Sequence, residues 1–122
     1  MSKMVADAVL DAALNYLKNN VTTMVVCSAQ PANYSEATGT YDLATKTGLT
    51  SSDFTVADDT SGRKVTLAEQ DAITVDHTST ATHIALCAGS VLLYVTTCTS
   101  KALEAGDKVD CPAWKINIQD PS

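Results

Sequence analysis

Aromatic residues, histidine and glycine are scarce in this sequence, and each shortage argues against a class of protein. Of 122 residues, 5% are aromatic, two are histidine and five are glycine. Sugar-binding modules stack their ligand on exposed aromatic rings, which are few here. The chain has no glycine-rich loop before a helix to hold a phosphate and no G-x-S-x-G nucleophile turn. His77 falls in a polar segment that is expected to be a loop, and His83 begins an expected strand. We therefore predict no enzyme, with no catalytic, cofactor-binding or metal-binding residue.

The sequence also lacks a long hydrophobic run. The longest strongly apolar stretch, Val91 to Val95, is far shorter than the ~20 residues that cross a bilayer. Asp7 and Asp11 interrupt the segment where a signal peptide would need an uncharged apolar core. The protein is expected to stay in the cytoplasm where it is synthesised, unless it leaves as part of an assembly.

Basic residues are outnumbered. Fourteen acidic residues stand against eight basic ones, and the formal net charge is −6. Such a surface repels phosphate backbones and anionic lipid, so neither nucleic acid nor membrane is an expected partner.

The four cysteines have no C-x-x-C spacing, which argues against a zinc knuckle or redox motif. Each lies in or beside a strand-like apolar run, so buried free thiols are expected. Because the count is even, disulfides remain an alternative that the sequence leaves open. The residues concerned are Cys27, Cys87, Cys98 and Cys111.

Two acidic motifs resemble functional sites but lack the required spacing. Asp59-Thr60-Ser61-Gly62 has one residue too many for the D-T-G or D-S-G of aspartic proteases. Neither Asp58-Asp59 nor Glu69 with Asp71 has the oxygen-ligand spacing of a calcium loop. We expect these carboxylates to be solvated.

A single domain over residues 1–122 is expected from the length, and one helix over residues 3–18 within the N-terminal 20 residues. Ser2 is the expected N-cap and Asn19-Asn20 the expected stop. The helix is amphipathic with a wide apolar stripe, expected to pack in the core or against another subunit. Its apolar residues are Val5, Val9, Ala12, Ala13 and Tyr16, adjoined by Leu10, Leu14 and Leu17.

Residues 21–122 are predicted to form a β domain with a long polar loop region at about 29–62, which holds two short strands near 40–44 and 54–57. Alternating apolar residues mark the clearest strands: Trp114, Ile116 and Ile118 share one face of the last one. Ala88-Gly89-Ser90 and Ala105-Gly106-Asp107 are expected turns. The fold class is mainly β, a compact β-sandwich or small barrel with one N-terminal helix. Further strands are expected at 22–28, 63–67, 73–75, 82–87 and 91–97.

Short motifs along nearly the whole chain resemble those of small virion proteins of tailed bacteriophages. They are Val9–Leu14, Cys27–Pro31 with Tyr34–Ala37, Ser61–Val65, Ala81–Leu86, Leu103–Asp107, and Pro112–Ile116 with Asp120-Pro121. The resemblance implies a virion structural protein that is synthesised in the host cytoplasm. It supplies no catalytic residues.

Within that class, the expected role is a capsid decoration or cement protein on the exterior of the head, with the major capsid protein as partner. One alternative is a tail, neck or fibre component with tail proteins as partners, and another is a carbohydrate-binding module. A homo-oligomer is expected because virion parts follow closed symmetry, but dimer and trimer are equally compatible with the sequence.

Overall fold

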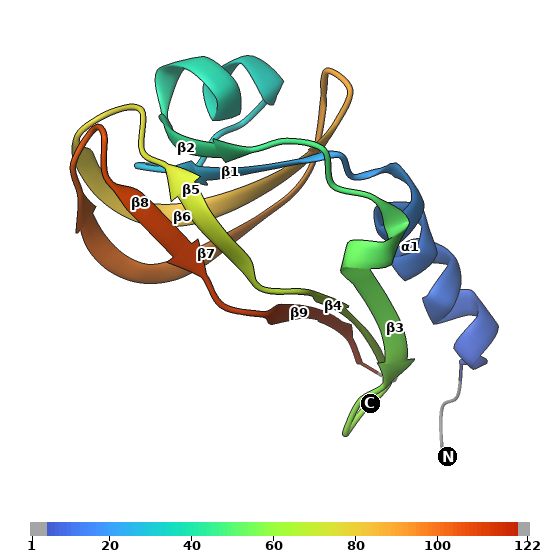
Figure 1. Cartoon of the computed structure of the whole chain (residues 1–122). Helices are drawn as coiled ribbons and strands as arrows, with labels where there is room; N and C mark the ends of the chain where they lie inside the picture. The colour runs from blue at the N-terminus through green and yellow to red at the C-terminus, as the bar shows by residue number, and fades with distance from the viewer. Residues whose placement is uncertain (1–4, 120–122) are drawn as a thin grey trace. The chain divides into compact units, whose positions relative to one another are not determined.

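The computed structural model describes residues 5–119, and their contacts divide them into two compact units (Figure 1). The first unit contains residues 5–20, 50–69 and 112–119, and the second contains residues 21–49 and 70–111. Each unit is therefore built from segments that are distant in sequence.

Helix α1 (Asp7–Asn20) packs on the sheet of the first unit. Leu10 and Leu14 are its buried residues, and full burial of a leucine side chain stabilises a fold by about 1.5–3 kcal/mol. The side-chain amide of Asn20 donates a hydrogen bond to the carbonyl of Tyr16, which satisfies a helix-end acceptor. The helix was predicted over residues 3–18 but begins at Asp7, since Val5 and Ala6 are not helical, and it runs two residues beyond the predicted end because both asparagines remain helical. The predicted N-cap, Ser2, lies outside the described residues.

The first unit's sheet has the order β3-β4-β9 and is antiparallel throughout. Strand β4 (Arg63–Leu67) lies between β3 (Phe54–Asp58) and β9 (Trp114–Ile118). Val65 and Leu67 are buried on one face, as their alternation predicted. Across the sheet, Leu67 is opposite Phe54 and Trp114, and Val65 is opposite Val56 and Ile116.

The second unit contains a four-stranded antiparallel sheet of order β2-β1-β6-β7. Its strands are β2 (Asp42–Lys46), β1 (Thr23–Cys27), β6 (Ser79–Ala88) and β7 (Val91–Leu103). Met24 to Cys27 are all buried, so the central strand β1 is covered on both faces. The predicted hairpin turn joins β6 to β7, and Gly89 adopts the positive φ of 58° that favours glycine there. Both strands extend further than predicted, since threonine and serine continue the pleated pairing beyond the apolar cores.

A two-stranded sheet completes the second unit, with β5 (Gln70–Thr74) antiparallel to β8 (Lys108–Cys111). The pairing is irregular between Gln70 and Ile73, where Ala72 has a φ of 53°. The backbone N–H of Ala72 donates to the carboxylate of Asp110 at 2.8 Å, which stabilises this bulge.

Residues 29–62 are more ordered than the loop that the sequence predicted. Strands β2 and β3 lie within one or two residues of the two expected short strands. Two helical segments were not anticipated: the π-helix η1 (Glu36–Thr40) and the 3-10 helix η2 (Ser51–Asp53). Thr50 and Asp53 cap η2 reciprocally, with Thr50 N–H donating to Asp53 at 2.8 Å.

The mainly β architecture with an N-terminal helix is confirmed. Among the described residues, none of the three sheets closes on itself as a small barrel would. No helix over residues 5–119 is long and apolar enough to cross a membrane.

Candidate functional site

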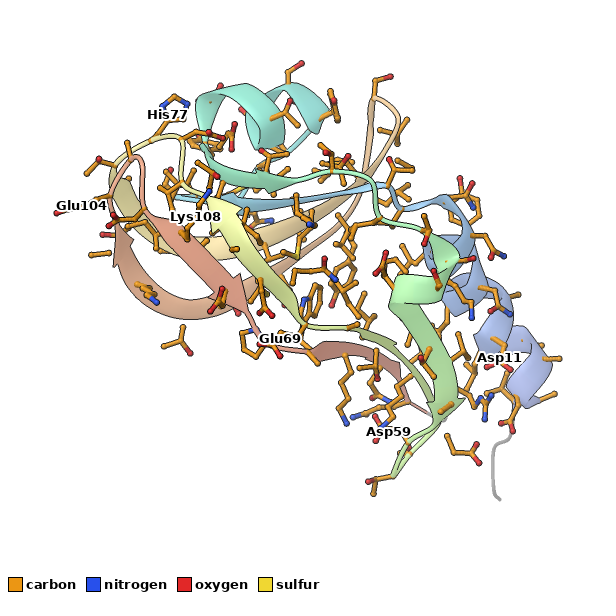
Figure 2. The ribbon with its side chains drawn as sticks, viewed as in Figure 1. Asp11, Asp59, Glu69, His77, Glu104 and Lys108 are labelled. Carbon is orange, nitrogen blue, oxygen red and sulfur yellow. The ribbon has the colours of Figure 1, made fainter. Side chains whose placement is uncertain are left out.

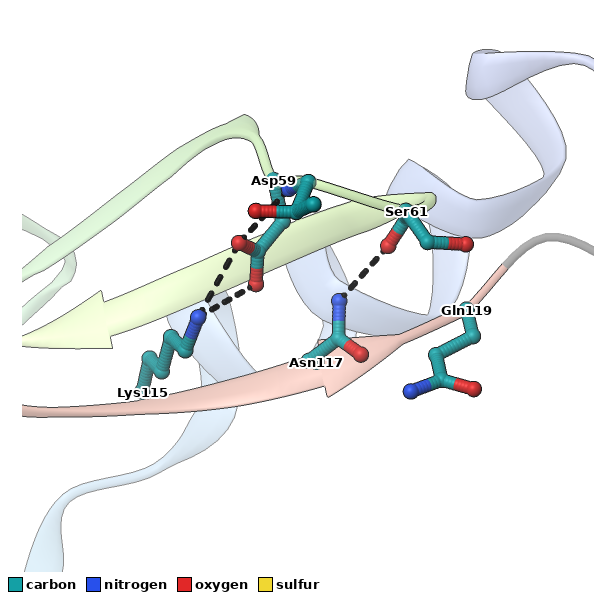
Figure 3. A pocket seen from close by; sticks show the side chains of 6 residues that line it. Asp59, Ser61, Lys115, Asn117 and Gln119 are labelled. Atoms are coloured by element: carbon teal, nitrogen blue, oxygen red, sulfur yellow. Dashed lines mark hydrogen bonds and ion pairs between the residues drawn. The ribbon is translucent and has the colours of Figure 1, made fainter.

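The most organised polar cluster lies at the β3–β4 turn of the first unit, in the motif Asp59-Thr60-Ser61-Gly62 (Figure 3). Gly62 has a φ of 74°, and a Cβ atom placed there would lie 1.9 Å from the carbonyl oxygen of Ile118. Only glycine permits this close approach of the turn to β9. The turn is therefore held against the strand that carries Lys115 and Asn117.

Asp59 is ion-paired rather than solvated. Its carboxylate accepts hydrogen bonds from Lys115 Nζ at 2.7 and 3.0 Å, and one oxygen also accepts the backbone N–H of Thr60. These bonds, that of Lys115 first, lower the pKa of Asp59. Only 9% of the Asp59 side chain is exposed, against 51% for Lys115. The expectation that this carboxylate is solvated is wrong, because β9, distant in sequence, brings an ammonium group to it.

Asn117 fastens the same turn from the neighbouring position on β9. Its amide nitrogen donates to the carbonyls of Ser61 and Arg63 at 3.0 and 3.1 Å. Together with the Asp59–Lys115 pair, these bonds hold the turn on β9 from both ends.

On the other side of the turn, Arg63 forms a second ion-pair cluster. Its Nε and Nη2 donate to the carboxylate of Asp11 on α1, at 2.8 and 3.2 Å, and its Nη1 donates to Asp58 at 2.7 Å. The carboxylates, Asp11 first, raise the pKa of Arg63 above its ordinary value. Figure 2 shows Asp11 on α1 and Asp59 at the turn. Two-point contact of this kind fixes orientation as well as distance, so it attaches α1 to β4.

A hollow of about 220 Å³ opens beside the turn. Its lining is polar, and its carboxylate and ammonium groups neutralise each other across the Asp59–Lys115 pair. The hollow therefore presents hydroxyl and amide groups suited to hydrogen bonding. It is lined by Asp59, Thr60, Ser61, Lys115, Asn117 and Gln119.

Helix α1 carries an apolar stripe on the side away from its buried leucines. Val9 and Tyr16 are 62% and 58% exposed, and Ala12 and Ala13 between them are also exposed. The spacing i, i+3, i+4, i+7 places these four residues, called here the outer stripe, on one helix face. The sequence analysis recognised these residues as part of a wide apolar stripe. In the structure, the residues of the helix that are buried are Leu10 and Leu14, and the outer stripe is left exposed.

The cysteines and histidines lie in the second unit. All four thiols are free; Cys27, Cys87 and Cys111 are buried, whereas Cys98 is only half-buried and so departs from the expectation of four buried thiols. Burial raises the pKa of Cys27 to about 12. His83 Nδ1 lies 2.8 Å from the hydroxyl of Thr82.

The predicted loop residue, His77, is exposed. Within residues 5–119, no three His, Cys, Asp or Glu side chains gather in a way that would hold a metal ion.

Comparison with known proteins returned no match to a family model, to a curated protein or to a solved structure.

Proposed function

We propose that this chain is a virion structural protein of a tailed bacteriophage, and specifically a capsid decoration or cement protein that binds the exterior of the assembled head. The observation that carries the proposal is the outer stripe, Val9, Ala12, Ala13 and Tyr16, exposed on a helix that is anchored from its other side. The motifs that resemble small phage virion proteins support the same assignment.

The anchoring of α1 makes the outer stripe a preorganised contact surface. Leu10 and Leu14 pack beneath the helix, and Asp11 is held by Arg63 at two points. Binding through a rigid face loses little conformational entropy, which favours affinity. Single exposed apolar residues are common, but four on one face point to a partner surface.

The charge of the chain suits a position on the outside of a head. A net charge of −6 disfavours contact with packaged nucleic acid, while the outer stripe itself is uncharged. A shell is stabilised by any protein that binds its assembled state and not its dissociated subunits. At a free concentration 100 times the dissociation constant, each site gains about 2.7 kcal/mol. Modest contacts therefore suffice when they are repeated over a lattice.

The first test is the copy number of the protein in purified virions, measured by quantitative mass spectrometry against the major capsid protein. We expect a number comparable to that of the capsid subunit. A count of a few to a dozen would instead assign the protein to the tail or neck, and absence from virions would refute a structural role.

The outer stripe is tested by substitution. Tyr16→Asp is expected to weaken cosedimentation with assembled, undecorated heads by at least about tenfold, since it introduces a charge into the apolar contact. Asn15→Asp is the matched control, because Asn15 is exposed on the same helix but outside the stripe. Equal binding by both variants would exclude the outer stripe as the contact.

A further inference from the structure

The hollow beside the β3–β4 turn is lined by hydrogen-bonding groups that the fold itself leaves unused. We propose that this hollow binds one residue of a neutral carbohydrate, through hydroxyl groups on adjacent carbon atoms of the sugar. The inference concerns the first unit alone and stands independently of the capsid assignment.

The wall of the hollow is fixed in the absence of a ligand. Asp59, with 9% of its side chain exposed, is held by Lys115, and Asn117 donates to two backbone carbonyls of the turn. Gly62 lets the turn lie against the carbonyl of Ile118. Polar groups that are already held in place lose little conformational entropy when they bind a ligand.

The bonds that hold the turn do not use every donor and acceptor of the groups that form them. An ammonium has three donors, and Lys115 Nζ makes only its two bonds to Asp59, at 2.7 and 3.0 Å, so one N–H remains. A carboxylate offers about four acceptor positions, of which Asp59 fills three, with Lys115 and the N–H of Thr60. Within residues 5–119, no hydrogen bond is formed by Asn117 Oδ1, the Gln119 amide or the Thr60 hydroxyl.

These unused groups gather around one small space. Lys115, Asn117 and Gln119 occupy alternate positions along β9 and just beyond its end, so their side chains emerge on the same face (Figure 3). The Thr60 hydroxyl belongs to the turn on the other wall of the hollow. The set combines donors with acceptors. A sugar hydroxyl is both a donor and an acceptor, so two neighbouring hydroxyls match such a mixture.

The charge of the hollow favours a neutral ligand. The carboxylate of Asp59 and the ammonium of Lys115 lie in direct contact, so their charges cancel for a group bound beside them. An anion such as phosphate gains no net attraction there and is also repelled by the chain's net charge of −6. A neutral polyhydroxylated ligand meets neither difficulty.

The size and lining of the hollow set the extent and strength of binding. Its volume of about 220 Å³ is below the ~300–1,000 Å³ of pockets for drug-sized ligands, which limits the occupant to one sugar residue. None of its six lining residues is aromatic, and Trp114 belongs to the opposite face of β9, with Ile116. Binding therefore depends on hydrogen bonds without ring stacking, and the expected dissociation constant is millimolar.

The test is a titration of the ¹⁵N-labelled full chain, followed by two-dimensional NMR. The probes are methyl glycosides of glucose, galactose, mannose and N-acetylglucosamine, each added to about 50 mM, well above the expected dissociation constant. At least one glycoside is expected to shift the amide signals of Thr60, Asn117 and Gln119. Sodium phosphate and N-acetylglycine methylamide are the comparison probes, for an anion and for a peptide group.

Two substitutions remove unused groups and spare the bonds that hold the turn. Gln119→Ala and Thr60→Val are each expected to raise the dissociation constant of the glycoside at least about threefold, because each removes a neutral hydrogen bond. Gln30→Ala is the matched control, since it makes the same exchange at an exposed position of the second unit. The dispersion of the amide signals shows whether each variant is folded, and either variant suffices if the other is not.

Every outcome supports or overturns the proposal. A glycoside that shifts the signals of the hollow, and that the variants but not Gln30→Ala bind more weakly, supports it. The proposal is overturned if no glycoside shifts these signals, if only phosphate or the peptide probe does, or if both folded variants bind like the wild type. The copy number in virions tests the capsid assignment separately, so the failure of either proposal leaves the other intact.

Discussion

Arg63 on β4 donates two parallel hydrogen bonds to Asp11 on α1, from Nε to Oδ1 at 2.8 Å and from Nη2 to Oδ2 at 3.2 Å. The residues are 52 positions apart in the chain. Since only 17% of the Arg63 side chain and 23% of the Asp11 side chain are exposed, water competes weakly for these groups. The pair is therefore a specific attachment of the helix to the sheet rather than a surface ion pair.

Arg63→Lys is expected to lower the thermal midpoint by a few degrees although it keeps the charge. A lysine ammonium cannot contact both oxygens of Asp11 and also reach Asp58. Differential scanning calorimetry measures the change. Lys64→Arg, the reverse exchange at the next residue of β4, is the control and should leave the midpoint unchanged. An Arg63→Lys midpoint equal to that of the wild type would show that the two-point contact contributes nothing.

Gly62→Ala and Gly48→Ala distinguish two causes of lost stability: backbone strain at positive φ and a steric clash of the added Cβ atom. Both residues have positive φ, but nothing lies within 4 Å of a Cβ at Gly48, whereas one at Gly62 would meet the carbonyl of Ile118. Strain alone costs about 1 kcal/mol, which is expected for Gly48→Ala. The added clash at Gly62 should bring the loss to about 3 kcal/mol. Urea unfolding of both variants measures the difference, and equal losses would contradict the close approach.

Stability should fall in acid as Asp59 takes up a proton. Its bonds with Lys115 and Thr60 lower its pKa in the folded state below the ordinary value of 3.8. The carboxylate therefore stabilises the fold fully above pH 3.8, and this contribution is lost as the pH falls through the lowered folded-state pKa. Asp59→Asn should be less stable than the wild type at pH 7, and this difference in stability should narrow only as the pH falls below about 3.8.

Denaturant unfolding over this pH range provides the measurement for Asp59. Asp71→Asn, at an exposed position of β5, serves as the control. A gap between Asp59→Asn and the wild type that stays constant with pH would argue against the ion pair.

Cys98 should be alkylated first in the native protein. It is half-buried, whereas the other three cysteines are buried. Because the pKa of Cys27 is about 12, its thiolate fraction at pH 8 is only about 10⁻⁴. Brief iodoacetamide treatment followed by peptide mass spectrometry should label Cys98 before Cys27. In guanidinium chloride all four should react alike, and equal labelling of Cys27 and Cys98 in the native protein would contradict the burial.

The Asp59–Lys115 ion pair of the candidate site could not be predicted from the sequence. The motif Asp59 to Gly62 was visible, but its spacing matched no catalytic or calcium pattern, so its carboxylates were expected to be solvated. Lys115 is 56 residues from Asp59, and no local pattern indicates that β9 will bring it within 2.7 Å. The one available signal was the clean alternation of β9, which places Lys115 and Asn117 on the same face.

Residue periodicity determined that the chain is mainly β, with β4 and β9 as strands and a helix near the N-terminus. The turn residues determined that the β6–β7 hairpin turns at Gly89. Period and turn chemistry are local properties, so a single sequence contains them. The covered flank of α1 was decided by tertiary structure. Both flanks are apolar at helical spacing, and only the docking of Leu10 and Leu14 on β3 and β4 leaves Val9 and Tyr16 exposed. The pairing of Asp59 with Lys115 was decided in the same way, because non-local contacts depend on strand order.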